Sequence, residues 1–359
     1  MRRVLSVLIM SVLIASGVFG LTVERGELRL ILDENSSRFT LELNTSGDTW
    51  EPLFYADDPR SSALDILDGN RVIRIGDTGS FQQVAEETEG GARYVWTNDR
   101  LEIVQDFTFI RGVLSVAYDA VQMTVTVTNV GEAETTVAVR LLIDTMLGES
   151  DNVHFTTATQ ERITREYGWD IATPDAWVVS PSPDLSYGFQ MMLRDDAITP
   201  IESAAVANWK RLSDSTWNYE VNTTRNFNRL PYSINDSALL LVYPPSVIEN
   251  GQSYTVVAQF GNVSPGGYLS PEASAERPTQ PPVLTPVSPT AEEESTGEPE
   301  AVEQTAPVDE GPSLVDLIGD LVTVIDEIDR LLSADTVTIE DVVRVRTELE
   351  RLINLITGR

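Results

Sequence analysis

The segment MTVTVTNVGEAETTVAVRLLID, residues 123–144, decides the fold class of this chain. Polar and apolar residues alternate over Met123–Thr128, which is the period of a half-buried strand. The turn residues Asn129-Val130-Gly131 follow, and a strand pattern resumes over Thr135–Asp144. We expect the two strands to pair as an antiparallel hairpin.

The same alternation recurs on both sides of this segment. Further strand patterns lie at Glu27–Leu32, Arg38–Leu43, Arg71–Ile75, Arg93–Thr97, Leu101–Ile110, Ala176–Ser180, Tyr187–Leu193, Ala238–Tyr243 and Tyr254–Phe260. No long helical period interrupts them. Short strands without helical crossovers predict a mainly β fold, with one large or two smaller antiparallel β-sandwiches over residues 21–263.

Residues 1–20 have the pattern of a secretory signal peptide. Arg2 and Arg3 precede the uncharged apolar run Val4–Phe19, and a cut after Gly20 is plausible. A retained membrane anchor is the alternative. We therefore expect an exported bacterial protein, periplasmic or associated with the cell envelope. The absence of cysteine excludes disulfides and a lipid-modified cysteine.

Residues 264–312 differ in composition from the sandwich. They hold ten of the 19 prolines, and ten acidic residues against one basic residue. Such a segment cannot bury enough apolar surface to order itself. It is predicted to be a disordered, acidic, proline-rich linker.

Residues 313–359 change to a helical period. Two heptad series are present: Leu314, Leu317, Leu321, Val324, Ile328 and Leu331, then Val342, Val345, Leu349, Leu352 and Ile356. They predict an antiparallel helical hairpin with coiled-coil packing. Its apolar stripes are broader than two helices can cover. We expect it to form a homo-oligomer or to dock on a helical protein partner; packing on its own sandwich is the alternative.

Composition limits the chemistry. The chain has no cysteine, one histidine (His154) and one lysine (Lys210). A catalyst built from it would work with carboxylates, tyrosines and backbone groups. His154 lies between Val153 and Phe155 without a nucleophile motif, so we expect a packed histidine and assign no catalytic residue. The net charge of −31 argues against nucleic acid and anionic membranes as direct partners.

Three patterns could carry a ligand. Asp144, Glu149, Asp151 and Asn152 follow a predicted strand and could supply oxygen ligands to calcium, with a plain polar loop as the alternative. No other cofactor is predicted. Trp169 is the tryptophan most expected to be exposed for sugar stacking.

Paired acidic residues are the third pattern. Asp57-Asp58 and Asp195-Asp196 are compatible with a glycosidase, since two carboxyls of unequal pKa suffice for that chemistry. Adjacent residues of a strand point to opposite faces, however, so neither pair converges by sequence alone.

Two segments carry a resemblance. Val125–Gly148 and Tyr243–Gly261 resemble segments of exported bacterial β-sandwich proteins of poorly defined function. Larger supersandwich proteins, including galactose mutarotases, share this architecture. Mutarotase catalysis relies on two histidines with a carboxylate, and this chain has one histidine, so the resemblance implies no catalytic residues.

The function expected from the sequence is that of a non-enzymatic, exported envelope protein. Its sandwich would be a binding or presentation domain, and its helical hairpin would be an oligomerisation or docking module. The alternative is a carbohydrate-binding module or a carboxylate-based carbohydrate-active enzyme.

The predicted hairpin can be tested by deletion. Removing residues 313–359 should convert an oligomer into a monomer, because the apolar stripes that join the copies are lost. Light scattering measures the mass of both proteins. An unchanged mass would contradict the assembly role.

Overall fold

A computed structural model describes residues 20–77, 79–150, 152–158, 162–169, 172, 175–276, 323, 324, 330 and 351. The chain divides into two compact units, Met1–Thr285 and Pro286–Arg359. In the second unit Thr323, Val324, Arg330 and Arg351 are helical. The other predicted hairpin residues, and residues 1–19 of the predicted signal peptide, lie outside the described residues.

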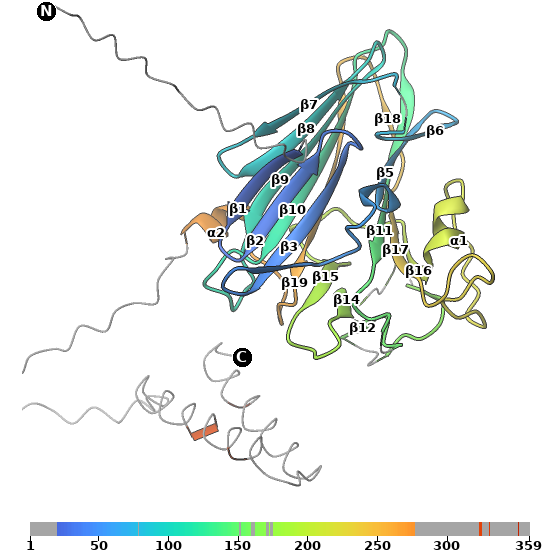
Figure 1. The fold of residues 1–359 in the computed structure, drawn as a ribbon. Helices are drawn as coiled ribbons and strands as arrows, with labels where there is room; N and C mark the ends of the chain where they lie inside the picture. The colour runs from blue at the N-terminus through green and yellow to red at the C-terminus, as the bar shows by residue number, and fades with distance from the viewer. Residues whose placement is uncertain are drawn as a thin grey trace, which may run out of the picture. The chain divides into compact units, whose positions relative to one another are not determined.

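Three antiparallel sheets make up the first unit, which confirms the mainly β sandwich (Figure 1). The four-stranded sheet runs β1 (Gly20–Arg25), β2 (Leu28–Asp33), β3 (Arg38–Ser46) and β4 (Thr49–Pro52). The eight-stranded sheet has the order β12 (Thr156–Thr157), β14 (Trp177–Pro181), β15 (Gly188–Met192), β19 (Ser253–Asn262), β10 (Ala120–Asn129), β9 (Leu101–Ile110), β8 (Gly91–Thr97) and β7 (Gln82–Glu87).

The third sheet carries the remaining strands. Its order is β13 (Tyr167–Gly168), β16 (Ser203–Asn208), β17 (Ser237–Val242), β11 (Thr135–Thr145), β5 (Ala63–Asp68) and β6 (Arg71–Arg74), and β18 (Ser246–Ile248) pairs with β11. In the first unit the described helices are η1 (Pro59–Ser61), α1 (Trp209–Asp214) and α2 (Pro271–Glu276). No helix among the described residues has the length and apolarity to cross a membrane.

One hydrophobic core joins the three sheets. It takes Leu30 from the four-stranded sheet, Val125 from the eight-stranded sheet and Leu141 from β11, all fully buried. The opposite face of β11 is also covered. There Leu142 packs with Leu212 of α1 in a second, smaller cluster. β11 is therefore buried on both faces.

The predicted hairpin between residues 123–128 and 135–144 is wrong. β10 pairs with β9 and β19, whereas β11 pairs with β5, β17 and β18. The turn after Asn129 therefore passes from one sheet of the sandwich to the other. Alternation identifies each strand, but which strands pair depends on long-range packing. β11 is buried on both faces, so it lies in the interior of a sheet that α1 covers.

The sandwich extends beyond the predicted boundary at residue 263. Tyr268 is buried, and its hydroxyl donates to the carbonyl of Asn262 at 2.7 Å. The backbone N–H of Leu269 donates to the carbonyl of Arg111 at 2.8 Å. Residues 264–276, which the sequence places in the linker, thus pack on the sandwich, held by the buried Tyr268 and by hydrogen bonds of Ser264, Leu269 and Ser274. The rest of the predicted linker lies outside the described residues.

Candidate functional site

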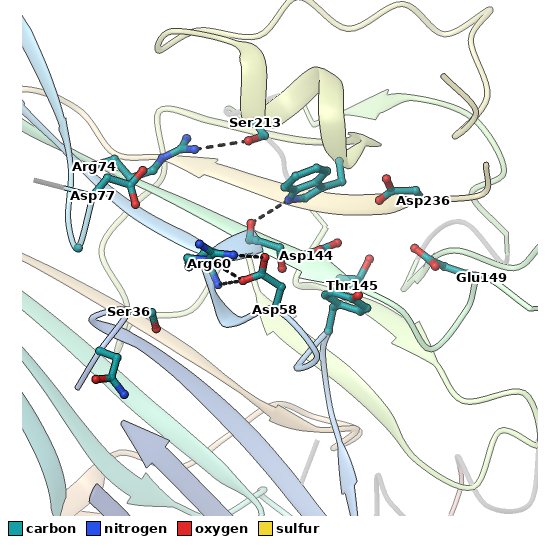
Figure 2. A pocket seen from close by; sticks show the side chains of 15 residues that line it. Ser36, Asp58, Arg60, Arg74, Asp77, Asp144, Thr145, Glu149, Ser213 and Asp236 are labelled. Atoms are coloured by element: carbon teal, nitrogen blue, oxygen red, sulfur yellow. Dashed lines mark hydrogen bonds and ion pairs between the residues drawn. The ribbon is translucent and has the colours of Figure 1, made fainter. Parts of the chain in front are cut away.

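A pocket of about 930 Å³ opens beside the end of β11 (Figure 2). Its walls come from segments far apart in sequence, which include Asn35 and Ser36, Arg74 and Asp77, and Asp236. Asp144, Thr145 and Glu149 come from the end of β11 and the turn after it, Asp58 to Ser61 from η1 and its N-cap, and Trp209 and Ser213 from α1. Its volume falls in the range of small-molecule sites.

Asp144 reaches the pocket because strand residues alternate between faces. It follows Arg140 and Leu142 at intervals of two, so all three project toward the face that α1 covers. Its backbone is held on both sides: its N–H donates to Ser62 Oγ at 3.0 Å, and its carbonyl accepts from the N–H of Tyr55 at 2.9 Å. These bonds attach the η1 region to the end of β11.

Burial raises the pKa of the Asp144 carboxyl to about 8. The charges of Asp236, Glu149 and Asp58 add to this rise. The Ser61 hydroxyl beside the carboxyl acts in the opposite direction, although its geometry is outside the range of a hydrogen bond. Asp144 is therefore a protonated acid at neutral pH.

Glu149 and Asp236 lie at one end of the pocket in Figure 2. Glu149 Oε1 accepts from the backbone N–H of Ser237 at 2.7 Å, which fixes the side chain at the start of β17. Desolvation raises the pKa of Glu149 to about 7 and raises that of Asp236 as well. The charge of Asp236 contributes to the shift in Glu149.

Asp58 differs from these three acids. It caps η1 and forms a two-pronged ion pair with the neighbouring Arg60, Oδ1 to Nε at 2.9 Å and Oδ2 to Nη2 at 3.0 Å. Hydrogen bonding to Arg60 lowers the pKa of Asp58. The pocket thus contains an ionised carboxylate and a protonated carboxyl, which is the pairing used in acid–base catalysis.

Trp209 supplies an apolar surface among these polar groups. It is half-buried, and its Nε1–H donates to the Ser61 carbonyl at 2.8 Å. Its backbone N–H donates to the carbonyl of Asp236 at 3.2 Å. The indole is therefore tied to both η1 and the Asp236 segment, in a pocket wall where a sugar ring could stack.

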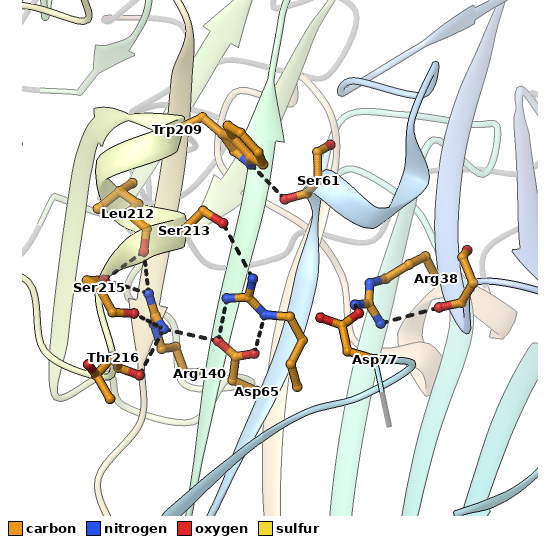
Figure 3. Close-up of polar contacts among 12 residues, drawn as sticks. Arg38, Ser61, Asp65, Asp77, Arg140, Trp209, Leu212, Ser213, Ser215 and Thr216 are labelled. Atoms are coloured by element: carbon orange, nitrogen blue, oxygen red, sulfur yellow. Dashed lines mark hydrogen bonds and ion pairs between the residues drawn. The ribbon is translucent and has the colours of Figure 1, made fainter. Parts of the chain in front are cut away.

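A buried ion cluster holds α1, and with it Trp209, against the sheet (Figure 3). Arg140, Asp65 and Arg74 are opposite one another on β11, β5 and β6. Asp65 Oδ2 contacts Arg140 Nη1 at 3.0 Å and Asp65 Oδ1 contacts Arg74 Nε at 2.9 Å. Arg140 also donates to the carbonyls of Leu212, at 2.7 Å, and Ser215, at 3.0 Å, at the end of α1.

The predicted calcium ligands are only partly brought together. Asp144 and Glu149 line the same pocket, whereas Asn152 accepts a hydrogen bond from Asn235 Nδ2 at 2.9 Å. Asp151 lies outside the described residues. Within the described part of the chain, no group of three or more acidic, histidine or cysteine residues is placed to hold a metal ion. The calcium site stays a prediction.

The tryptophan expected to be exposed is buried instead. Trp169 is 7% exposed because its ring packs in the main hydrophobic core, and its Nε1–H donates to Asp175 Oδ2 at 2.9 Å. His154 is buried against the ring of Phe227, and desolvation lowers its pKa to about 4. This histidine is packed and neutral, as the sequence predicts.

Several pocket residues were missed by sequence reasoning. Trp209, Ser61 and Asp236 belong to short segments without a periodic pattern, and only the fold brings them to the end of β11. The sequence did carry one signal for this site. Polar residues at the end of a buried strand, Asp144 and Glu149, mark the place where the sheet reaches the surface.

Comparison by sequence finds no matching family model and no matching curated protein. By structure the chain is similar to a protein from Escherichia coli K12 assigned as an aldose 1-epimerase, with 11% identity, a TM-score of 0.42, and coverage of 68% of this chain and 99% of that one. It is also similar to a galactose mutarotase-like protein from Lactobacillus casei ATCC 334, with 8% identity, a TM-score of 0.42, and coverage of 68% and 100%.

A third similar structure is an α-N-acetylgalactosaminidase from Bifidobacterium bifidum, with 10% identity, a TM-score of 0.35, and coverage of 68% of this chain and 36% of that one. These likenesses support a distant β-sandwich resemblance and transfer no residue role. The prediction that the chain is not an enzyme is contradicted by them, because the matched structures bear the names of enzymes. That prediction is withdrawn.

The ion cluster predicts a large loss of stability on removing Arg140. In Arg140→Met, Asp65 keeps only Arg74, and the carbonyls at the end of α1 lose their donor. We expect the free energy of unfolding in urea to fall by about 3–5 kcal/mol. The surface pair Arg93–Asp106 is the control, and Arg93→Met should cost less than about 1 kcal/mol. Equal effects of both variants would contradict the anchoring role.

The raised pKa values of Asp144 and Glu149 predict that stability falls as pH rises. Both carboxyls titrate near pH 4 when unfolded and near 7 to 8 when folded, so the folded protein holds more protons between these limits. In Asp144→Asn the free energy of unfolding should fall less steeply between pH 5 and 8 than in the wild type, by up to about 1.4 kcal/mol per pH unit.

The measurement is urea unfolding at several pH values for Asp144→Asn and the wild type. Taking the difference between the two removes the contribution of neutral His154, which raises stability with pH below 6.5. Asp196→Asn, an exposed acid outside the pocket, should follow the wild type. Parallel curves for Asp144→Asn and the wild type would show that Asp144 ionises normally.

Proposed function

We propose that the pocket beside β11 is the active site of a carbohydrate-active enzyme that works through carboxylates. Asp144 is the proton donor, and Asp58 is the ionised carboxylate that stabilises developing positive charge. The observation that carries the proposal is the contrast within one pocket between a desolvated acid and an acid paired with arginine. Acid–base chemistry at sugar oxygens uses this contrast.

The geometry supports a role for each group. Asp144 is 6% exposed, and its backbone is fixed by two hydrogen bonds, so its proton would be presented from a constant position. Arg60 keeps Asp58 ionised without burying it. The chain's scarcity of histidine, cysteine and lysine leaves carboxyls as the groups available for proton transfer.

The other pocket walls suit a sugar. Trp209 offers one ring face, and the hydroxyl of Ser213 and the carboxyls of the pocket can bond sugar hydroxyls. A pocket of about 930 Å³ has room for more than one ring. Binding without chemistry is the second candidate, and Trp209 is the observation that favours it.

We also propose that the protein acts outside the cytoplasm, and that residues 313–359 join copies of the chain or dock it on a helical partner. The charge and hydropathy pattern of residues 1–20 and the heptad series support these roles. Copies joined in this way would gain avidity for a polysaccharide, because each bound pocket raises the local concentration of the next.

The proposed chemistry can be tested with a panel of neutral and amino-sugar oligosaccharides. Nuclear magnetic resonance follows both anomeric exchange and bond cleavage. Asp144→Asn should lower the rate at least about 100-fold, because it removes the proton donor. The wild-type rate should fall above about pH 8, where Asp144 loses its proton. Trp209→Ala should raise KM with a smaller effect on kcat.

Asp196→Asn is the matched control and should keep the wild-type rate, since this acid is exposed and outside the pocket. Circular dichroism checks that each variant is folded. If no oligosaccharide of the panel is turned over, but one binds to the wild type and not to Trp209→Ala, the binding function is favoured. Full activity in Asp144→Asn would contradict the proposed proton donor.

A further inference from the structure

The segment between α1 and β17 exposes three large apolar side chains to solvent. Leu230 is 73% exposed, Tyr232 is 72% exposed and Ile234 is 69% exposed. Among the described residues, no other stretch of five exposes three large apolar side chains in this way. Single exposed apolar residues are normal on a protein surface, whereas a group of them marks an interaction surface. The turn at residues 230–234 is therefore a candidate docking element.

Hydrogen bonds fix the backbone that presents these side chains. The N–H of Tyr232 donates to the carbonyl of Arg229 at 2.8 Å, and Arg229 and Ser233 exchange both backbone hydrogen bonds, at 2.9 and 3.0 Å. The fully buried Asn208 donates from Nδ2 to Ser233 Oγ at 2.8 Å. The turn is thus ordered before it meets a partner, and docking costs it little conformational entropy.

Basic residues gather at the base of the turn, although the chain as a whole is acidic. Residues 209–235 hold four basic residues against two acidic ones, whereas the chain holds 25 against 56. Lys210 and Arg229 share one acid, Asp214. The guanidinium of Arg229 also lies over the ring of Tyr232, 5.7 Å from its centre. Because salt screens charges beyond about 10 Å at 0.1 M, these nearby cations outweigh the distant acids at this surface.

We propose that the turn at residues 230–234 inserts into the headgroup region of a phospholipid bilayer. Apolar side chains flanked by tyrosine and arginine suit this layer, where the apolar parts reach the acyl chains and the cations meet the phosphates. The inference is independent of the proposed enzyme, because neither Leu230, Tyr232 nor Ile234 lines the pocket beside β11.

The size of the exposed group favours a bilayer over a protein partner. Three such side chains bury on the order of 500 Å², which is less than the roughly 800 Å² that each partner contributes to a stable protein interface. A protein would also need a cavity shaped to receive the turn. A fluid lipid layer accepts a protruding apolar turn without one.

A fluorescent label on the full chain tests the inference. The chain has no cysteine, so Leu230→Cys provides the only thiol, which is labelled with an environment-sensitive nitrobenzoxadiazole group. On adding phosphatidylcholine vesicles, we expect its emission to rise and to shift to shorter wavelength, because the label enters an apolar layer. The label reports the surroundings of its own position, so binding through the apolar run of residues 4–19 would not give this signal.

Matched variants locate the insertion. Leu114 is 76% exposed in another loop, and a label on Leu114→Cys should keep the emission it has in water. Adding Tyr232→Ser and Ile234→Ser to the labelled Leu230→Cys chain should raise the lipid concentration at half-saturation at least about ten-fold, because most of the inserting apolar surface is lost. Circular dichroism should show unchanged folding, since the replaced side chains are largely exposed.

The outcomes decide between a bilayer and a protein partner. A label at position 230 whose emission does not respond to vesicles overturns the inference, and so does an equal response from the label at position 114. Light scattering covers the remaining case. An oligomer that Tyr232→Ser and Ile234→Ser dissociate, without any response of the label to lipid, would show that the turn joins copies of the chain and would exclude the bilayer.

Discussion

The site depends on the burial of Asp65 between two arginines. A buried carboxylate is tolerated only when its charge and its lone pairs are satisfied, and Arg140 and Arg74 do this from the strands on either side. Arg140 is fully buried as well, and its terminal Nη–H groups that do not reach Asp65 need acceptors. Those acceptors are the carbonyls at the end of α1. The need to satisfy one buried guanidinium therefore fixes a short helix that has little stability of its own.

This constraint sets the electrostatics of the pocket. The strand pattern that buries Arg140 also places Asp144 on the same face, four residues later. Among the described residues that line the pocket, Arg74 is held by Asp65 and Arg60 by Asp58, so no cation there remains for Asp144, Glu149 or Asp236. The raised pKa values of these acids follow from burial without compensation. A chain with 56 acidic residues against 25 arginines and lysines reaches this state readily, because many acids must go without a cation.

Sequence patterns predicted where the strands lie better than which strands pair in the sheets. Alternation located β9, β10 and β19 because each has one half-buried face, and it located β11 from its apolar run. It could not show that β10 and β11 lie in different sheets, since pairing depends on contacts between distant residues. Residues 264–276 show a related limit: composition alone assigns them to the linker, yet the buried Tyr268 and hydrogen bonds of Ser264 and Ser274 hold them on the sandwich.

The site was predictable only in the part that the strand pattern reaches, and the rest depends on long-range packing. Asp144 and Glu149 could be singled out because a strand end is where a buried sheet meets solvent. Trp209 could not, because α1 is a six-residue helix whose position depends on Arg140 rather than on its own periodicity. Trp169 was expected to be exposed on a loop, yet its ring packs in the main core and Asp175 satisfies its N–H. Exposure of a tryptophan is thus decided by what packs on its ring: both indole N–H groups are hydrogen-bonded, but Trp209 lies at the margin of the smaller cluster in the pocket wall and stays partly exposed.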